Sequence, residues 1–251
     1  DLEIGKDGYL YVSVGDGGCD YDGDGCAGSN DAARDGNVLV GKILRITLDG
    51  GIPPDNPLVG PNSARCALVG QIESQKVCQE TFASGLRNPF RMAFDPESPG
   101  VKFLINEPGQ DAWEEINEGK AGADYGWNVR EGGCVNGRPR DCADPEGGLT
   151  DPVFAYAHSE ESECDVITGG AFVPRGIWPA PYDGSYLFGD FACGGIFRLS
   201  AQGAEPRKAD LFLADDPGIV HLLFGPYEST QALYFTTYDN GGEIRRVVYS
   251  G

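Results

Sequence analysis

Short apolar runs alternate with Asp- and Gly-rich turns along this chain. The clearest runs form three pairs, at residues 10–14 and 42–46, 186–190 and 196–199, and 233–238 and 244–247. Runs of this length, rich in Val, Ile, Tyr and Phe and bounded by turn residues, predict β-strands. A strand pair that repeats and cannot bury its own face needs stacked neighbours, so the pattern predicts a β-propeller.

The spacing of the runs predicts about four blades. The expected units lie within residues 1–50, 82–119, 165–199 and 219–249, the last two as four-strand units. Within the first unit, Asp7 and Gly8 separate two short apolar runs and predict a hairpin turn. Residues 51–80 and 120–160 are rich in Pro or Gly and predict irregular connections. Because no linker divides the chain, we expect one domain over residues 1–251.

Composition narrows the classes of function. The chain has 251 residues, of which 38 are Gly and 17 are Pro, and this favours short strands over helices. Its formal net charge is −20. Since a nucleic-acid groove is basic, nucleic acid is excluded as a partner, whereas divalent cations suit this acidity. No apolar run approaches the length of a membrane span.

The eight cysteines indicate an oxidising compartment, so we expect a secreted or periplasmic protein. Eight cysteines allow 105 pairings. Near-neighbour bridges are the simplest set, namely Cys19–Cys26, Cys66–Cys78, Cys134–Cys142 and Cys164–Cys193. None of these spacings matches a zinc ribbon. The alternative is a set of free, buried thiols.

An acidic loop offers candidate metal ligands. The residues Asp20, Asp22, Asp24 and Asp31 occupy the first, third, fifth and twelfth places of a calcium-loop pattern, with Gly at the sixth. The glycine allows the turn that brings the carboxylates together. No helices are predicted beside the loop, so it would imitate an EF-hand loop without being an EF-hand. We expect calcium here, and the alternative is a solvated acidic insertion.

Several short motifs, in their order and spacing, resemble one family. They are residues 15–18 (GDGG), 41–46 (GKILRI), 52–57 (IPPDNP), 85–94 (GLRNPFRMAF), 113–117 (WEEIN), 125–127 (YGW), 168–170 (TGG) and 184–190 (GSYLFGD). This pattern is similar to the soluble quinoprotein glucose/sorbosone dehydrogenases, also called aldose sugar dehydrogenases. The resemblance implies an all-β, six-bladed propeller with pyrroloquinoline quinone (PQQ) and calcium at its axial mouth. Since this chain supplies about four blades, an upstream fragment or a second chain would complete the ring.

The resemblance also implies roles for individual residues. Arg87 and Asn88 match the pair that contacts PQQ, and an arginine fork suits a planar tricarboxylate. Alternatively, Arg87 pairs with an interior carboxylate while Asn88 makes a turn with Pro89. Gly109 and Gln110 match the backbone pair whose carbonyls hold the calcium that polarises PQQ.

Two further positions resemble a nearby structural calcium region. Glu115 and Tyr125 match that region. The alternative for Glu115 is a salt bridge between blades.

The basic and catalytic positions depart from the family. Its general base is a histidine that would lie just upstream of Asp1, and Asp16 matches the acidic residue that would orient it. A lysine that contacts PQQ aligns with Ala192, and an Arg-x-Arg motif aligns with residues 218–220. His221 lies at the same strand start and is a candidate replacement base, or else a packed or surface residue.

Two hypotheses follow from these features. The first is an oxidoreductase that transfers a hydride from C1 of a small aldose to PQQ, with calcium as Lewis acid. The second is a secreted, calcium-binding propeller without enzymatic activity that presents its loops to a glycan or a protein. The intact loop motifs favour the first hypothesis, and the missing basic residues favour the second.

Overall fold

The computed structural model describes residues 1–18, 32–66, 71–73, 75–138, 140–142, 147–158, 163–201, 208–214 and 218–249. Within these ranges the regular elements are β-strands and two short 3-10 turns, η1 (Ala180–Tyr182) and η2 (Asp239–Gly241). None of the described elements is a helix long and apolar enough to cross a membrane.

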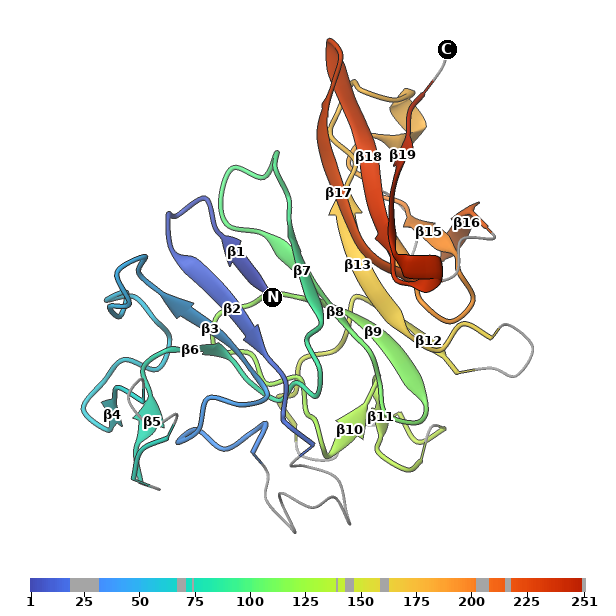
Figure 1. The fold of residues 1–251 in the computed structure, drawn as a ribbon. Coiled ribbons are helices and arrows are strands. Elements are labelled where there is room, and N and C mark those ends of the chain that lie inside the picture. The colour runs from blue at the N-terminus through green and yellow to red at the C-terminus, as the bar shows by residue number, and fades with distance from the viewer. Residues whose placement is uncertain are drawn as a thin grey trace.

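The strands form four blades that follow one another along the chain (Figure 1). Blade 1 is β1 (Leu2–Ile4), β2 (Leu10–Val14), β3 (Lys42–Ile46) and β6 (Thr81–Ala83). Blade 2 is β7 (Arg91–Phe94), β8 (Phe103–Glu107), β9 (Trp113–Glu118) and β12 (Phe154–Ala157). Blade 3 is β13 (Ile167–Phe172), β14 (Tyr186–Asp190), β15 (Ile196–Leu199) and β16 (Ala209–Leu213). Blade 4 is β17 (Ile219–Tyr227), β18 (Thr230–Thr237) and β19 (Glu243–Val247).

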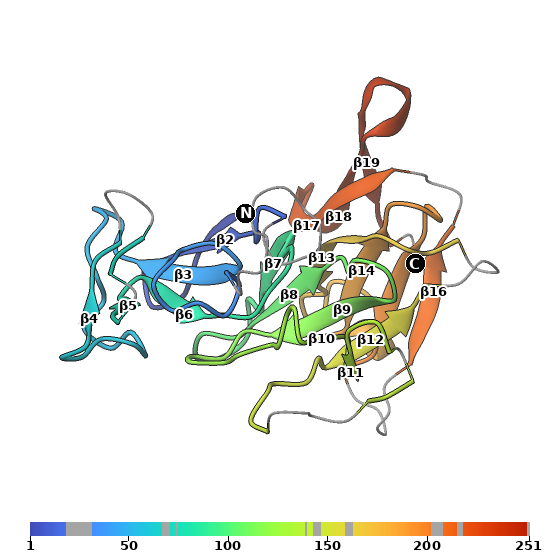
Figure 2. The ribbon, with the colours of Figure 1, turned by 90° about the horizontal axis from the view of Figure 1, so that it is seen from below.

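Each blade is an antiparallel meander built from tight turns. In blade 1, Leu10 pairs with Ile4 across the predicted hairpin, and Gly8 supplies the positive φ of 78° that its turn requires. Two small pairs lie outside the blades: β10 (Arg130–Glu131) with β11 (Cys134–Val135), and the parallel pair β4 (Ser63–Ala64) with β5 (Val77–Cys78). Figure 2 shows β4 and β5 at the edge of the molecule, far from the first strands of the blades.

Apolar side chains between neighbouring blades form the core. Between blades 1 and 2, the ring of Tyr11 lies 5.2 Å from the rings of Phe82, Phe94 and Phe103. Between blades 3 and 4, buried residues such as Leu187 and Leu222 belong to one cluster. Burial of this kind is the main source of stability, so each blade depends on its neighbours.

The first strand of each blade is the innermost one. These four strands, β1, β7, β13 and β17, border a groove of about 450 Å³, which we call the axial groove. Glu3, Met92, Gly170 and His221 are among the residues that line it, one from each inner strand. The all-β propeller architecture predicted from the sequence is therefore confirmed.

The blade boundaries differ from those predicted. The fourth strands of blades 1 to 3 are β6, β12 and β16, and each follows a long connection instead of a tight turn. The segment 165–199 therefore holds only three strands of its blade, and blade 4 has three strands in the described part of the chain. The segment 120–160, predicted to be irregular, contributes β12 to blade 2.

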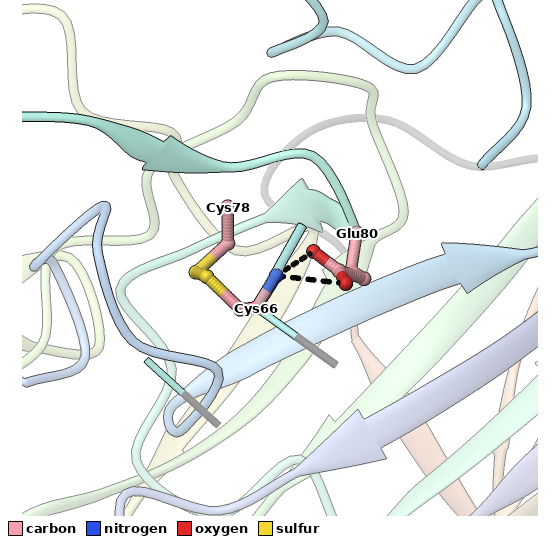
Figure 3. Close-up of side chains that lie close together, drawn as sticks. All are labelled: Cys66, Cys78 and Glu80. Carbon is pink, nitrogen blue, oxygen red and sulfur yellow. Dashed lines mark hydrogen bonds between the residues drawn. A yellow bond between two sulfur atoms is a disulfide. The ribbon is translucent and has the colours of Figure 1, made fainter. Parts of the chain in front are cut away.

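Three of the four predicted disulfides are confirmed, namely Cys66–Cys78, Cys134–Cys142 and Cys164–Cys193. Cys19 and Cys26 lie outside the described residues. Figure 3 shows the Cys66–Cys78 bridge beside Glu80, whose two carboxylate oxygens accept hydrogen bonds from the Cys66 amide at 3.0 and 3.1 Å. The bridge and this buried carboxylate fix the loop between β3 and β6. Because both sulfurs are bonded to each other, Cys66, Cys78 and Glu80 do not form a set of metal ligands.

Candidate active site

The predicted cofactor residues come together at one end of the blades. Asp16 follows β2, Gly109 and Gln110 follow β8, and Arg87 and Asn88 precede β7. Since β2 and β8 are the second strands of their blades, they end at the side where the inner strands begin. We call this end the mouth. The acidic loop of Asp20, Asp22, Asp24 and Asp31 lies outside the described residues.

Asp16 is buried and held on three sides. Its carboxylate accepts hydrogen bonds from Trp127 Nε1 at 2.8 Å and from the Gly18 amide at 2.9 Å. Its own amide donates to the carbonyl of Arg87 at 2.8 Å. These contacts join residues of blade 1, the start of β7 and the Gly-rich segment after β9 in one network. Asp16 is thus held at the mouth.

The Arg87 guanidinium contacts the loop after β8. Its Nη1 donates to the carbonyls of Pro108 at 3.1 Å and Gly109 at 2.8 Å, and its Nη2 donates to the side chain of Gln110. No ion pair of Arg87 with a carboxylate occurs among the described contacts. The guanidinium therefore lies against a carbonyl that the sequence predicts as a calcium ligand.

Glu107 holds the backbone before β7. One of its carboxylate oxygens accepts hydrogen bonds from the amides of Arg87 and, at 3.3 Å, Asn88. Glu107 is buried, and its two hydrogen bonds fix the backbone of Arg87 and Asn88. Nothing in the sequence distinguishes Glu107 from the other acidic residues, although it is the last residue of β8.

Glu131 organises the loop that carries Gly109 and Gln110. Its Oε1 accepts hydrogen bonds from the amides of residues 110 to 113, at 2.8, 3.0, 2.9 and 3.1 Å. Gly109 is needed in this loop because a Cβ there would lie 1.8 Å from the carbonyl oxygen of Trp113. Sequence reasoning missed Glu131, which lies in the segment predicted to be irregular.

Three buried carboxylates surround a small cavity below the mouth. Glu107, Glu115 and Glu131 line it together with Tyr125 and Trp127, and its volume is about 10 Å³. Asn117 donates from Nδ2 to Glu107 at 3.1 Å and to Glu115 at 2.9 Å. Glu115 makes no ion pair between blades in the described structure; its other oxygen accepts a hydrogen bond from the Gly132 amide.

Acidic and basic side chains both line this cavity, the basic ones being Arg87 and Arg130. Burial and the neighbouring negative charge raise the pKa of Glu107 well above its ordinary value, and burial also raises the pKa of Glu115. The buried Oδ1 of Asn117 has no hydrogen-bond partner within the described structure. Carboxylate and amide oxygens are the ligands that calcium prefers, and a cavity of this size admits a single small particle.

His221 lies away from this network. It lines the axial groove on β17, burial and the charge of Arg91 lower its pKa, and its buried Nδ1 has no partner in the described structure. The described hydrogen bonds of Asp16 include none to a histidine. At the positions where the family has basic residues, Ala192 is exposed and uncharged. Gly218 has a φ of 77°, and a Cβ there would lie too close to Asp239.

Another buried carboxylate, that of Glu114, lies between blades 2 and 3. Glu114 Oε1 lies 2.6 Å from His158 Nε2 and accepts a hydrogen bond from the Gly109 amide at 3.2 Å, while Oε2 accepts one from the Ile167 amide at 2.7 Å. Burial raises the pKa of Glu114 to about 9. The sequence analysis missed Glu114 too, although its bond to the Gly109 amide helps to hold the loop at the mouth.

The architecture and the mouth define a class, that of propellers with a polar, carboxylate-rich axial site. A model of the Glucose / Sorbosone dehydrogenase family matches residues 1–246. The chain belongs to this family, and its fold is the six-bladed type of propeller, of which the described residues form four blades.

Relatives cover nearly all of the chain. HIPL2 protein of Arabidopsis thaliana is 32% identical over 209 residues, which are 74% of this chain and 27% of that protein. Aldose sugar dehydrogenase YliI of Escherichia coli is 26% identical over 245 residues, 96% of this chain and 57% of that protein. The chain therefore spans less than two thirds of these relatives.

Solved structures agree with the fold. The apo form of the soluble aldose sugar dehydrogenase from E. coli matches with a TM-score of 0.71 and 25% identity, over 98% of this chain and 62% of that one. The PQQ-bound aldose sugar dehydrogenase from Streptomyces coelicolor matches with a TM-score of 0.65 and 23% identity, over 98% and 59%. At that identity the second match speaks for the fold alone.

Proposed function

We propose that this chain forms most of a single-domain, PQQ- and calcium-dependent oxidoreductase that acts on a small aldose. The observation that supports this most is the hydrogen-bonded network of Asp16, Arg87, Gly109 and Trp127 at the mouth. Segments far apart in the sequence are brought there by strands that end on the same side. The membership in the sugar dehydrogenase family supports the same reaction class.

Calcium fits the buried cavity. Glu107 and Glu115 would be its ligands, and Tyr125 lines the same cavity. Arg87 and Arg130 line it too, so their guanidinium groups would have to stay on its far side from the ion. A divalent cation would neutralise two carboxylates whose raised pKa values show that their negative charge is unfavourable without one. A second calcium in the loop of Asp20, Asp22, Asp24 and Asp31 remains part of the proposal. Gly109 and Gln110 would serve a calcium only if Arg87 turned away.

PQQ fits one side of the mouth. Bound PQQ would accept the hydride. Arg87 would hold one of its carboxylates with the fork that now contacts Gly109, and Asn88 would hold a quinone oxygen. Asp16, fixed by Trp127, would orient a general base supplied by sequence upstream of Asp1.

The proposal extends to location and assembly. Three disulfides support an extracellular or periplasmic site. The relatives carry the remaining length in the same polypeptide, since this chain covers 57% of the E. coli protein. We therefore favour an upstream or downstream segment of the same protein over a second chain to complete the ring.

The proposal is tested by dye-linked turnover on a panel of aldoses, with the full-length protein, PQQ and calcium. We expect turnover that needs both additions and falls at least a hundredfold in Asp16→Asn, because loss of base assistance costs about 10²–10⁴ in rate. Lys102→Gln is the control, because Lys102 directly precedes β8 and so lies at the end of that strand opposite the mouth. No turnover on any aldose, with the protein folded, would contradict the proposal.

The second candidate is a non-enzymatic, secreted calcium-binding propeller that binds a glycan or a protein. The observation that favours it is the lack of a cation at Ala192 and Gly218, together with the engagement of Arg87 by backbone carbonyls. Calorimetry separates the two candidates. Calcium binding without any PQQ binding would support the second.

A further inference from the structure

A second cleft lies at the end of blades 2 and 3 that is opposite the mouth. Its volume is about 800 Å³, and its walls are the turn between β7 and β8, at residues 95–102, and the connection between β13 and β14, at residues 173–184. β7 begins at the mouth and ends at this turn, which Figure 1 shows at the end of blade 2 away from β10 and β11. Sites for small ligands occupy about 300–1,000 Å³, so this rear cleft has the size of a binding site. It shares no lining residue with the cavity below the mouth.

The wall at residues 95–102 is held in place from outside the cleft. Lys6, in the hairpin turn of blade 1, donates from Nζ to the carbonyls of Pro96 at 2.6 Å and Ser98 at 2.5 Å. Asp95 Oδ1 accepts hydrogen bonds from the amides of Glu97 at 3.0 Å and Ser98 at 3.2 Å. Three of the residues that line the cleft are prolines, whose rings fix φ. A wall that is already ordered costs a ligand little entropy on binding.

Arg175 reaches the cleft with unused donors. Its amide donates to Glu97 Oε1 at 2.7 Å, and its Nε lies 2.8 Å from Glu97 Oε2, so the ion pair joins the two walls. Glu97 also lines the axial groove, and the pair therefore stands between the groove and the rear cleft. Neither Nη1 nor Nη2 has a partner among the described contacts of Arg175. Most donors of a guanidinium with a fixed direction thus remain available to a ligand.

Asp183 supplies an acceptor beside this donor. Its Oδ1 accepts a hydrogen bond from the Gly176 amide at 2.9 Å, and it makes no ion pair in the described structure. Because Gly176 directly follows Arg175, this bond holds the carboxylate next to the backbone that carries the guanidinium. One wall of the rear cleft therefore presents a donor and an acceptor together.

The charges in the cleft suit a neutral ligand. Glu97 neutralises Arg175, and Asp95 is paired with Lys102 at 3.2 Å, so that neither Asp95 nor Lys102 is assigned to the ligand. Asp183 leaves one negative charge, which disfavours an anion, and a metal ion needs several oxygen ligands where the lining offers this single unpaired carboxylate. A hydroxyl group both donates and accepts, so a polyhydroxylated molecule can use both groups of the wall.

The floor of the cleft is aromatic. A cavity of about 120 Å³ shares four lining residues with the rear cleft, among them Gly184, so it continues the cleft inward. Phe172 and Tyr186 line this inner part, and both are buried. Aromatic rings offer apolar surface on which the C–H face of a sugar ring can pack.

We propose that the rear cleft binds a neutral oligosaccharide. One hydroxyl would accept hydrogen bonds from the Arg175 guanidinium, and a neighbouring hydroxyl would donate to the Asp183 carboxylate. The volume lies near the upper end of the range for ligand sites, so we expect several sugar units instead of one. The inference goes beyond the proposed function, because this site lies at the other end of the blades and needs neither PQQ nor turnover.

The test is calorimetric titration of the full-length protein without PQQ. The probes are three neutral chains, maltohexaose, laminarihexaose and xylohexaose, and the acidic chain hexagalacturonate. We expect a neutral chain to bind with an affinity that does not depend on ionic strength, and Arg175→Gln to weaken it about tenfold. Arg245→Gln is the matched control: Arg245 Nε is likewise bonded to a glutamate, Glu243, at 2.7 Å, but on β19 outside the cleft. Thermal melting checks that each variant is folded.

Filling the cleft gives an independent test. Ala180 is exposed and lines the cleft, so Ala180→Trp should abolish binding, whereas Ala157→Trp places the same ring at the end of β12 nearest the mouth and should not. Binding that survives in Ala180→Trp, equal affinities of Arg175→Gln and Arg245→Gln, tighter binding of hexagalacturonate, or no binding of any neutral chain would each overturn the inference. Oligosaccharide binding without turnover on any aldose would uphold the rear cleft and refute only the proposed reaction.

Discussion

Single carboxylates hold the mouth together. Asp16 and Glu131 are both buried, and each collects hydrogen bonds from donors that are distant in sequence. An ionised buried carboxylate is tolerated only when its oxygens are satisfied in this way. The Gly-rich segment supplies the Trp127 donor to Asp16 and the Glu131 carboxylate itself, so the mouth depends on that segment.

The bond from Trp127 to Asp16 can be tested against a second tryptophan. Trp127→Phe removes the donor to a buried carboxylate, whereas Trp178→Phe removes an Nε1 that is buried without a hydrogen-bond partner in the described structure. Both rings are nearly buried, so both variants lose similar apolar contact. We expect Trp127→Phe to lower the free energy of unfolding by about 1–3 kcal/mol more than Trp178→Phe. Equal losses in urea titrations would contradict this.

The paired acids Glu107 and Glu115 predict a pH-dependent response to calcium. Their pKa values are raised in the folded protein, so without metal they favour folding below pH 4.5, and this contribution is lost as the pH rises above it. Melting temperatures in a chelator should fall from pH 5 to pH 8, and calcium should restore them most at pH 8. Glu115→Gln should flatten the fall. A calcium effect independent of pH would contradict the assignment.

At the scale of elements, strands with local turns were predictable and strands with distant partners were not. The runs at 10–14, 42–46, 186–190 and 196–199 coincide with β2, β3, β14 and β15. By contrast, β12 pairs with β9 across a connection of irregular sequence, and no local pattern indicates that pairing. The mouth shows the same division: motifs pointed to Asp16 and Arg87, whereas Glu131 gains its role only from tertiary contacts.

The loop between β14 and β15 offers a gain-of-function test. Ala192 is exposed there, so a lysine fits without strain, whereas an arginine at Gly218 would clash with Asp239 at a φ that disfavours side chains. We expect Ala192→Lys to raise PQQ affinity about tenfold, and Ala201→Lys, also exposed but on another loop, to leave it unchanged. Calorimetry decides, and equal affinities for the two variants would contradict PQQ binding at this mouth.

At the scale of the molecule, stability is unevenly shared among the blades. Blades 2 and 3 are covered on both faces, whereas blades 1 and 4 each pack on one neighbour within the described structure. Leu2 is 62% exposed on the free face of blade 1, and Ile244 is 78% exposed on blade 4. A propeller avoids such faces by closing its ring, and the longer relatives have the chain length to do so.

This arrangement predicts dye binding by residues 1–251 expressed alone. Exposed apolar faces bind the fluorescent dye ANS, so the isolated chain should bind more of it than the full-length protein does. Ile244→Lys should reduce the fluorescence, because it places a charge on the free face of blade 4. Leu211→Lys is the control, since Leu211 is 59% exposed but lies on β16, the outer strand of blade 3. Equal dye binding by the isolated chain and the full-length protein would contradict this prediction. So would an equal loss of fluorescence in the two lysine variants, because the dye would then not bind at the free faces of blades 1 and 4.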